Sequence, residues 1–257
     1  MIKYKPSRVK NKKNILREFN QDKYLNILNF CKTKKLISLN HIDKFHNKTS
    51  DVNNNIFKEV AKEKKIMSHY ITKFSKNLNN IVDLGCGFGS KSLALIKKKA
   101  FYKKSFLLID IAPNGIEIIK LLIKSTKKII PKIKLEVSDF YEQKNIKTKI
   151  PINSLVFTSY SLHYKKKLNE KFLKLILRIK PKFVIHFEPI YEHYNKNTKS
   201  HKKIREYILE NNYSLNLLSI LKKYEKQKKI KIIYEKKNVF GVNKLLPFSI
   251  IVWQRSN

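Results

Sequence analysis

A glycine-rich turn between an apolar run and a helix-like segment constrains this chain most. Three of its five glycines, Gly85, Gly87 and Gly89, lie within five consecutive residues. They follow the apolar run 81–84 and precede segment 90–96. Glycine adopts positive φ and lets a ligand approach main-chain amides, and a helix that begins there adds free N–H groups and a positive dipole end. The cluster predicts a strand, a ligand-binding turn and a helix; a tight turn without a ligand is the alternative.

The spacing of these glycines excludes two common phosphate-binding loops. The dinucleotide fingerprint Gly-x-Gly-x-x-Gly needs its third glycine where Ser90 stands. In the phosphate-cradling loop lysine directly follows glycine, whereas Ser90 separates Gly89 from Lys91. What remains is an acid, Asp83, two residues before the first glycine. Because a carboxylate repels phosphate and attracts cations, we expect a nucleoside ligand that carries an ammonium or sulfonium group.

Segment 83–89, Asp-Leu-Gly-Cys-Gly-Phe-Gly, resembles the first motif of the class I S-adenosylmethionine-dependent methyltransferases. The resemblance covers about residues 79 to 255. It implies S-adenosyl-L-methionine as the cofactor and an α/β, Rossmann-like fold, in which a mostly parallel seven-stranded sheet ends in an antiparallel hairpin. It also implies that the loop binds the cofactor through Asp83, Gly85, Cys86, Gly87 and Gly89.

Two further apolar runs end in acidic residues. Segment 105–110 is typical of a buried parallel strand and ends in Asp110, placed to accept ribose hydroxyls; a helix cap is the alternative. In the resembled family, an acid after the third strand meets the adenine amino group, and the next residue lines the ring. Asp139, which alone would suit a turn, stands there. The resemblance thus adds cofactor contacts at Asp110, Ile111, Asp139, Phe140 and Thr158.

The rest of the chain alternates strand-like and helix-like segments. Apolar runs at 154–159 and 183–187 flank segment 168–177, whose apolar residues recur at helical spacing. This alternation favours a parallel sheet covered on both faces. The runs 231–235 and 248–253 leave no room for a helix between them and predict an antiparallel pair. The strand order is implied by the resemblance alone.

The first 78 residues lie outside the resemblance, and their apolar spacing is compatible with helices, one of them at about 55–74. We divide the chain into a basic, helical N-terminal extension, 1–78, and a methyltransferase domain, 79–257. Ligands of such folds bind beyond the carboxyl ends of the strands, where added segments form lids. We therefore expect the extension to cover the cofactor cleft; helices that only pack are the alternative.

Histidine, tyrosine and carboxylate side chains gather after the fourth and fifth predicted strands. Methyl transfer from a sulfonium is an in-line displacement with a neutral leaving group, so alignment supplies much of the catalysis. A base is needed only where the nucleophile must lose a proton. His163 is the first candidate, since an imidazole pKa of about 6.5 suits this role; Glu188 is the second, and Tyr160 is expected to contact the substrate. The alternatives are a helix cap for His163, a turn role for Glu188, and a core position for the nearby His186.

The segment after the fourth strand also bears on the methyl acceptor. Enzymes that methylate amino groups of DNA bases typically carry Asn/Asp-Pro-Pro-Tyr/Phe there, whereas segment 158–161 is Thr-Ser-Tyr-Ser. The Ser-Leu-His-Tyr stretch at 161–164 and Phe-Glu-Pro at 187–189 resemble methyltransferases of small molecules more closely. The expected function is transfer of a methyl group to a small molecule or biosynthetic intermediate.

The formal net charge of +38 leaves a second function open. Such a charge suits a polyanion, and an RNA methyltransferase with the same cofactor site is the alternative. Lysines are nevertheless spread along the chain, and abundant lysine, asparagine and isoleucine also follow from adenine- and thymine-rich coding. The most concentrated basic stretch precedes Glu18. A catalytically silent module that binds a nucleotide or a partner is a third possibility.

Several absences in the sequence limit location and chemistry. No apolar run approaches the ~20 residues of a membrane span, so membrane insertion is not expected. The amino terminus lacks a secretory apolar segment, which predicts a cytoplasmic protein with Cys31 and Cys86 reduced; an organellar presequence is the alternative. The seven histidines form no recognisable metal-binding pattern with the cysteines. Nothing in the sequence indicates an oligomeric state.

Overall fold

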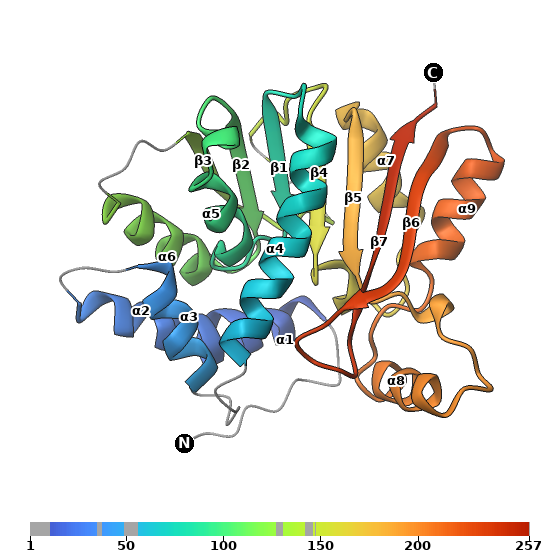
Figure 1. Cartoon of the computed structure of the whole chain (residues 1–257), viewed down its shortest axis with the longest axis horizontal. Helices are drawn as coiled ribbons and strands as arrows, with labels where there is room; N and C mark the ends of the chain where they lie inside the picture. Colours follow the sequence, from blue (N-terminus) through green and yellow to red (C-terminus); the bar gives the residue numbers. More distant parts are fainter. Residues whose placement is uncertain are drawn as a thin grey trace.

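The computed structural model describes residues 11–34, 38–48, 56–126, 131–141, 146 and 148–256. Its strands form one seven-stranded sheet in the order β3-β2-β1-β4-β5-β7-β6 (Figure 1). Paired strands run parallel except at β7, which is antiparallel to β5 and β6. The predicted Rossmann-like fold class is confirmed. The strands are β1 (Asn80–Leu84), β2 (Ser105–Asp110), β3 (Lys132–Val137), β4 (Leu155–Ser159), β5 (Phe183–Glu188), β6 (Ile230–Phe240) and β7 (Phe248–Arg255).

Helices cover both faces of the sheet (Figure 1). On one face, α2, α4, α5 and α6 pack against strand residues such as Ile81 and Phe157. On the other, α7 and α9 pack against residues such as Val82 and Val156. Because successive strand residues point to opposite faces, near-continuous apolar runs supply both packing surfaces. The helices that follow β1 in the chain are α5 (Ser90–Ile96), η2 (Lys99–Phe101), α6 (Pro113–Lys124), η4 (Leu162–Tyr164), α7 (Glu170–Ile179), η5 (Tyr191–His193), α8 (Lys199–Glu210) and α9 (Leu217–Lys226).

The described part of the first 78 residues is largely helical. It contains α1 (Lys12–Leu16), the π-helical segment η1 (Arg17–Tyr24), α2 (Leu25–Lys32), α3 (Leu39–Lys48) and α4 (Ile56–Ser75). In Figure 1, α1, α2 and α3 lie across the edge at which the parallel strands end. Tyr24, Ile42 and Met67 belong to the same buried cluster as the strands. These helices therefore share the core of the sheet, and the division at residue 78 stays a prediction; the basic stretch 1–10 lies outside the described residues.

Two asparagines join η1 to α6. The Asn114 backbone N–H donates to Asn20 Oδ1 at 2.7 Å, and Asn114 Nδ2 donates to the Asn20 carbonyl at 2.8 Å. We call this pair the asparagine clasp. It occupies the first turn of α6, where helix N–H groups have no partner within the helix. The clasp therefore satisfies an amide at the helix start and fixes η1 beside the glycine loop.

A chain of buried polar groups crosses the sheet through His186. His186 Nδ1 lies 2.9 Å from Thr158 Oγ1, and Trp253 Nε1 donates to His186 Nε2 at 2.9 Å. Burial lowers the pKa of His186 to about 4, so the ring is neutral at neutral pH. Since Nε2 accepts from Trp253, Nδ1 carries the proton and donates to Thr158. His186 is thus a hydrogen-bonded core residue, as its alternative interpretation predicted.

Candidate active site

The glycine loop joins β1 to α5 and is closely packed at each glycine. Gly85, Gly87 and Gly89 have φ values of 84°, 58° and 75°, the left-handed region that disfavours other residues. A Cβ on Gly85 would overlap the Ser161 side chain, and a Cβ on Gly87 would lie 2.7 Å from the Tyr24 hydroxyl. Gly85, Cys86 and Gly87 line the pockets described below. A side chain at Gly85 or Gly87 would therefore collide with Ser161 or Tyr24, and the loop presents its main chain to the pockets.

Gly89 precedes α5 as its N-cap, and a Cβ there would lie 2.8 Å from Ile119 Cγ1 of α6. It is not among the residues that line either of the pockets described below. Gly89 thus shapes the turn and lets α5 and α6 pack closely, and its assignment to cofactor binding stays a prediction.

Asp110, at the end of β2, holds the glycine loop through its carboxylate. Oδ2 accepts from the Gly87 N–H at 2.7 Å, and Oδ1 accepts from the Ala112 N–H at 2.9 Å. Burial raises the pKa of Asp110 to about 6, against the opposing effect of these backbone donors. Each carboxylate oxygen has a second acceptor position, and Asp110 and Ile111 both line a pocket. The group can accept hydroxyl donors of a ligand without releasing the loop.

Asp83, within β1, is buried with an incomplete set of hydrogen bonds. Oδ2 accepts from Ser92 Oγ at 2.6 Å, while buried Oδ1 has no hydrogen-bond partner among the described residues. Burial raises the pKa of Asp83 to about 7. Asp83 lines a pocket together with Gly85 and Gly87. A buried carboxylate oxygen without a donor, beside a glycine cradle, suits a ligand that brings a cationic group.

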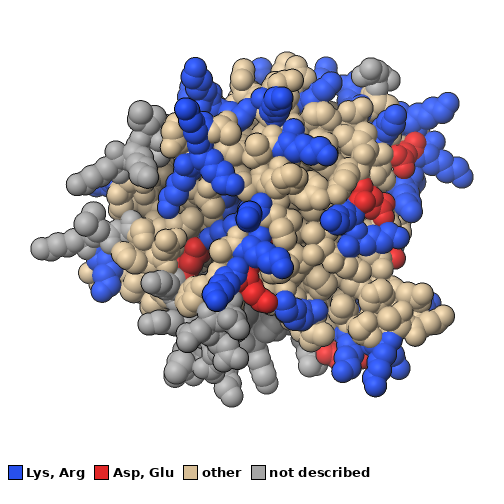
Figure 2. All heavy atoms as spheres, in the orientation of Figure 1, with Lys and Arg blue, Asp and Glu red and all other residues tan. Residues whose placement is uncertain are grey.

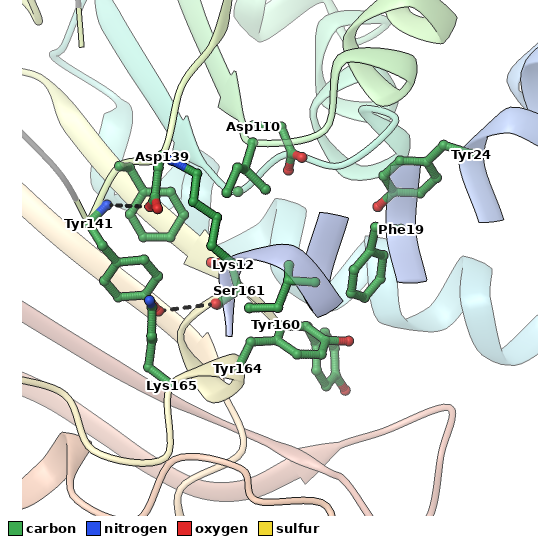
Figure 3. A pocket seen from close by; sticks show the side chains of 14 residues that line it. Lys12, Phe19, Tyr24, Asp110, Asp139, Tyr141, Tyr160, Ser161, Tyr164 and Lys165 are labelled. Atoms are coloured by element: carbon green, nitrogen blue, oxygen red, sulfur yellow. Dashed lines mark hydrogen bonds between the residues drawn. The ribbon is translucent and has the colours of Figure 1, made fainter. Parts of the chain in front are cut away.

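One pocket lies over the ends of β2 and β3, and we call it the β2–β3 pocket. Its empty space is about 630 Å³, including the part open to solvent. Phe140 and Tyr141 stack at 4.5 Å, and Asp139 Oδ1 accepts from the Tyr141 N–H at 3.0 Å. Figure 3 shows Tyr24 and Phe19 on the side opposite Asp139, whereas the Lys12 side chain is drawn beside Asp139. The lining comprises Lys12, Ile15, Phe19, Tyr24, Gly85, Asp110, Ile111, Asp139, Phe140, Tyr141, Tyr160, Ser161, Tyr164 and Lys165.

A second pocket, which we call the β4 pocket, adjoins it past the end of β4. Its empty space is about 1550 Å³, again with the open part included. It shares Phe19, Tyr24, Gly85, Tyr160 and Tyr164 with the β2–β3 pocket, so the two form one cleft. Its other lining residues are Lys23, Asp43, Val60, Glu63, Lys64, Asp83, Cys86, Gly87, Phe88, Ser90, Lys91, Ser159, His163, Val242, Asn243 and Leu246.

His163 lines the β4 pocket and lies against Glu188. Their Nδ1 and Oε2 atoms are 3.5 Å apart, and both side chains are almost completely buried, with 2% and 1% exposed. Glu188 Oε1 accepts from the backbone N–H groups of Ser161 and Leu162 at 3.0 and 3.1 Å. Burial alone would raise the pKa of Glu188, but His163 and these donors outweigh it and lower the pKa. Glu188 therefore carries a negative charge behind His163.

Glu188 lies behind His163 and is not among the lining residues of either pocket. Its Oε1 is bound by the η4 turn, while Oε2 lies 3.5 Å from His163 Nδ1 and has no hydrogen-bond partner among the described residues. The geometry suits positioning of His163, and the predicted role of Glu188 as second base stays a prediction. It also fixes a turn, which was its alternative interpretation.

Tyr160 stands where the two pockets meet. Its backbone has φ 51°, a left-handed conformation that costs energy outside glycine. Its hydroxyl donates to Glu63 Oε2 at 3.3 Å, and Lys91 Nζ lies 5.1 Å from the ring centroid. Burial, reinforced by the Glu63 carboxylate, raises the pKa of Tyr160 well above its usual range, so the hydroxyl stays protonated. The strained backbone thus holds the ring in the cleft, where contact with a substrate was expected.

Thr158 lies in the sheet interior. Its side chain is fully buried, its hydroxyl pairs with His186, and it lines neither pocket. Its assignment to cofactor binding stays a prediction that this placement does not favour. In contrast, the structure brings Asp83, Gly85, Cys86, Gly87, Asp110, Ile111, Asp139, Phe140, Tyr160 and His163 together in one cleft.

Sequence reasoning missed the residues that the N-terminal helices bring to this cleft. They include Phe19 and Tyr24 of η1, Asp43 of α3, and Glu63 and Lys64 of α4. These segments lie far from the glycine loop in sequence, and no motif marks them. One available signal was Glu63, an acid within a helical pattern of a strongly basic chain.

The described residues were also compared with two other kinds of feature, a metal-binding cluster and a membrane-spanning helix. No group of three or more His, Cys, Asp or Glu side chains there is arranged to hold a metal ion. None of the helices in the described ranges combines the length and apolar character required to cross a bilayer.

The strand order and the position of the glycine loop define the class I methyltransferase fold, and solved structures agree. Magnesium protoporphyrin IX methyltransferase from Synechocystis PCC 6803, with bound SAH, is 14% identical; the match covers 96% of this chain and 100% of that chain with a TM-score of 0.60. The methyltransferase domain of bacterial CtHen1 is 17% identical, with 79% and 100% covered and a TM-score of 0.52.

A third similar structure is the small RNA methyltransferase HEN1, at 15% identity and a TM-score of 0.55. That match covers 76% of this chain and 26% of the longer protein. No family model matches the sequence, and no curated protein matches it. The likeness therefore establishes the fold, while the reaction has to be argued from the cleft.

Proposed function

We propose that this protein is an S-adenosylmethionine-dependent methyltransferase that acts on a small molecule. The observation that carries the proposal is the buried Oδ1 of Asp83, which has no hydrogen-bond partner among the described residues and lines a pocket together with Gly85 and Gly87. A cationic nucleoside ligand fits both features. The bound SAH described for the Synechocystis structure supports the same cofactor.

The cleft offers a place for each part of the cofactor. The stacked Phe140 and Tyr141 rings and the Asp139 carboxylate suit an adenine ring and its amino group. Asp110 suits the ribose hydroxyls, because its oxygens keep free acceptor positions. Asp83 suits the positively charged end of the methionine part. When bound, the cofactor supplies an electrophilic methyl group and leaves as a neutral thioether.

His163 is positioned to take a proton from the acceptor. Glu188 Oε2 lies 3.5 Å from Nδ1 at the edge of the imidazole ring, and its negative charge would stabilise the imidazolium that forms on proton transfer. Because His163 lines the β4 pocket, the proton it takes comes from a group bound there. Tyr160 and Tyr164 line both pockets and would align the acceptor with the methyl group.

The charge of the β4 pocket favours a small acceptor over a nucleic acid backbone. Three of its lining residues are lysines, Lys23, Lys64 and Lys91, and three are acids. The whole chain, in contrast, has 57 basic and 19 acidic residues. The pocket is therefore enriched in carboxylates, which repel phosphodiesters. A flat organic acceptor would fit its aromatic walls.

RNA methylation is the second candidate, because of the surface outside the cleft. Figure 2 shows lysine and arginine spread over the viewed face, with few acids among them. Such a surface favours RNA in a salt-dependent manner. The similarity to HEN1, described as a small RNA methyltransferase, is consistent with this candidate.

A single labelling experiment separates these functions. Purified protein is incubated with S-adenosylmethionine labelled on its methyl group and with fractionated cell extract. We expect label in a low-molecular-weight product, and none with the Asp110→Ala variant. Label in nuclease-sensitive polymer would instead establish the RNA candidate. Cofactor binding without transfer to any fraction would contradict an autonomous methyltransferase and favour a silent module.

A further inference from the structure

Glu63 is a charged residue on the buried face of a helix. The buried positions of α4 include Ile56, Glu63, Met67 and Ile71, which recur at intervals of seven, four and four residues. That stripe packs against the sheet, so apolar side chains are expected along it. Glu63 is only 6% exposed, yet it lines the β4 pocket. Burying a carboxylate is costly unless it is paired, which demands a reason for an acid at this position.

The partners of Glu63 within the chain are too few for a buried carboxylate. Oε2 accepts one hydrogen bond, from the Tyr160 hydroxyl, at a long 3.3 Å. Oε1 forms an ion pair with Lys91 Nζ at 3.8 Å, which is beyond hydrogen-bond distance, and receives no hydrogen bond from the described residues. A carboxylate has about four acceptor positions. Glu63 therefore has acceptor positions left for a ligand in the β4 pocket.

Asp43, a second acid in the same pocket, shows what complete pairing looks like. Its Oδ2 accepts from Lys64 Nζ at 2.6 Å, and its Oδ1 accepts from Ser90 Oγ at 3.2 Å. Both oxygens are thus used by the fold, and Asp43 ties α3 to α4 and α5. Of the three acids that line the β4 pocket, Glu63 and Asp83 thus have incomplete hydrogen bonding, and Glu63 is the one that contacts Tyr160.

The aromatic rings that line the β4 pocket also favour a positive charge. Phe19, Tyr24, Phe88, Tyr160 and Tyr164 line the β4 pocket, and the faces of such rings attract cations. Lys91 already uses the Tyr160 ring in this way, with Nζ 5.1 Å from its centroid. A ligand group that donates hydrogen bonds and carries or develops positive charge would supply the missing donor to Glu63 and would be attracted to the faces of these rings.

We propose that Glu63 binds the accepting atom, and that this atom is an amine nitrogen. The proposal rests on the proposed function and names its substrate class. The neutral amine donates one N–H to Glu63 Oε1, and its lone pair forms the new N–C bond. The C–S bond breaks with its electron pair returning to sulfur. Glu63 stabilises the positive charge that develops on nitrogen, and the excess proton then leaves to the His163 imidazole or to solvent.

Sinefungin tests this placement without knowledge of the acceptor. In this analogue an amine-bearing carbon replaces the methylsulfonium, so an ammonium group lies near the position of the transferred methyl group. We would measure its dissociation constant and that of S-adenosylhomocysteine, which lacks this group. The proteins are the unmodified chain, Glu63→Gln and Glu63→Asp, each checked for its thermal melting. Glu59→Gln is the matched control, because Glu59 lies one turn earlier on α4 and pairs with the exposed Lys244.

Glu63→Gln should weaken sinefungin binding about 10-fold or more, the range for a lost hydrogen bond between charged groups. Its binding of S-adenosylhomocysteine should change less than about 2-fold. Glu63→Asp, which keeps the charge, should retain part of the preference, and Glu59→Gln should retain all of it. An equal loss for both ligands would place Glu63 at their shared amino acid end and overturn the proposal, as would no loss for either. If the unmodified chain itself binds neither sinefungin nor S-adenosylhomocysteine, the proposed function fails.

Discussion

The two halves of the cleft are built from different kinds of sequence. The β2–β3 pocket takes its main polar groups from the ends of neighbouring strands, Asp110 after β2 and Asp139 after β3. The β4 pocket takes Asp43, Glu63 and Lys64 from helices that precede the sheet. Parallel strands bring their carboxyl ends to one edge by topology, whereas the helices depend on packing. In the proposed function the β2–β3 pocket is the cofactor half, whose acids are placed by the sheet, and the β4 pocket is the acceptor half, whose helix residues are placed by long-range contacts.

Asp110→Ala should have the largest effect, and it should fall on the cofactor half. The change removes the acceptor of the Gly87 and Ala112 N–H groups as well as the expected ribose contacts. Hydrogen bonds to a charged group contribute about 1.5–3 kcal/mol each, so we expect cofactor affinity to fall about 100-fold. Isothermal titration with S-adenosylhomocysteine measures it.

Glu117→Ala provides the control for that measurement. Glu117 lies on α6, the helix that follows β2; its side chain is 46% exposed and pairs with Lys120 at 2.9 Å. Its removal should leave affinity unchanged within about 2-fold, as expected for an exposed ion pair. Equal affinities for Asp110→Ala and the unmodified chain would show that the β2–β3 pocket does not hold the cofactor.

The same contrast explains what could be predicted from the sequence. Strand periodicity and the glycine spacing predicted the sheet and placed Asp83, Asp110 and Asp139 near the ends of strands. They could not show that Thr158 pairs with His186, because that contact depends on the facing of two neighbouring strands. Nor could they show that Glu188 Oε1 accepts hydrogen bonds from the Ser161 and Leu162 N–H groups of the η4 turn. Side-chain direction and nonlocal partners decide such roles, and neither is encoded in spacing.

Asp83, where β1 meets the cleft, should make stability depend on pH. Burial raises its pKa from 3.8 to about 7, so the folded chain binds a proton more tightly than the unfolded chain. Stability should therefore fall as pH rises from about 4 to about 7, and then level off. Asp110, whose pKa is raised to about 6, acts in the same direction.

Asp83→Asn should remove part of that slope. The amide oxygen can still accept from Ser92, while the buried charge is gone. We expect the variant to melt about 5 °C higher than the unmodified chain at pH 8, and the difference to shrink at pH 4. Melting curves across this range measure it. Parallel curves for the two proteins would mean that Asp83 does not carry a raised pKa.

Asn114→Ala should have the smallest effect, because it weakens the asparagine clasp between η1 and α6 and changes no residue that lines either pocket. It removes the Nδ2 bond to the Asn20 carbonyl but keeps the backbone bond to Asn20 Oδ1. Loss of one partly buried hydrogen bond costs about 1 kcal/mol, which corresponds to a several-fold change in local opening. Hydrogen exchange over residues 11–34 should quicken by that factor, while exchange in β1, β4 and β5 stays unchanged. A uniform change over the whole chain would show that η1 unfolds together with the sheet, and the long-range half of the cleft would then be as firmly fixed as the local one.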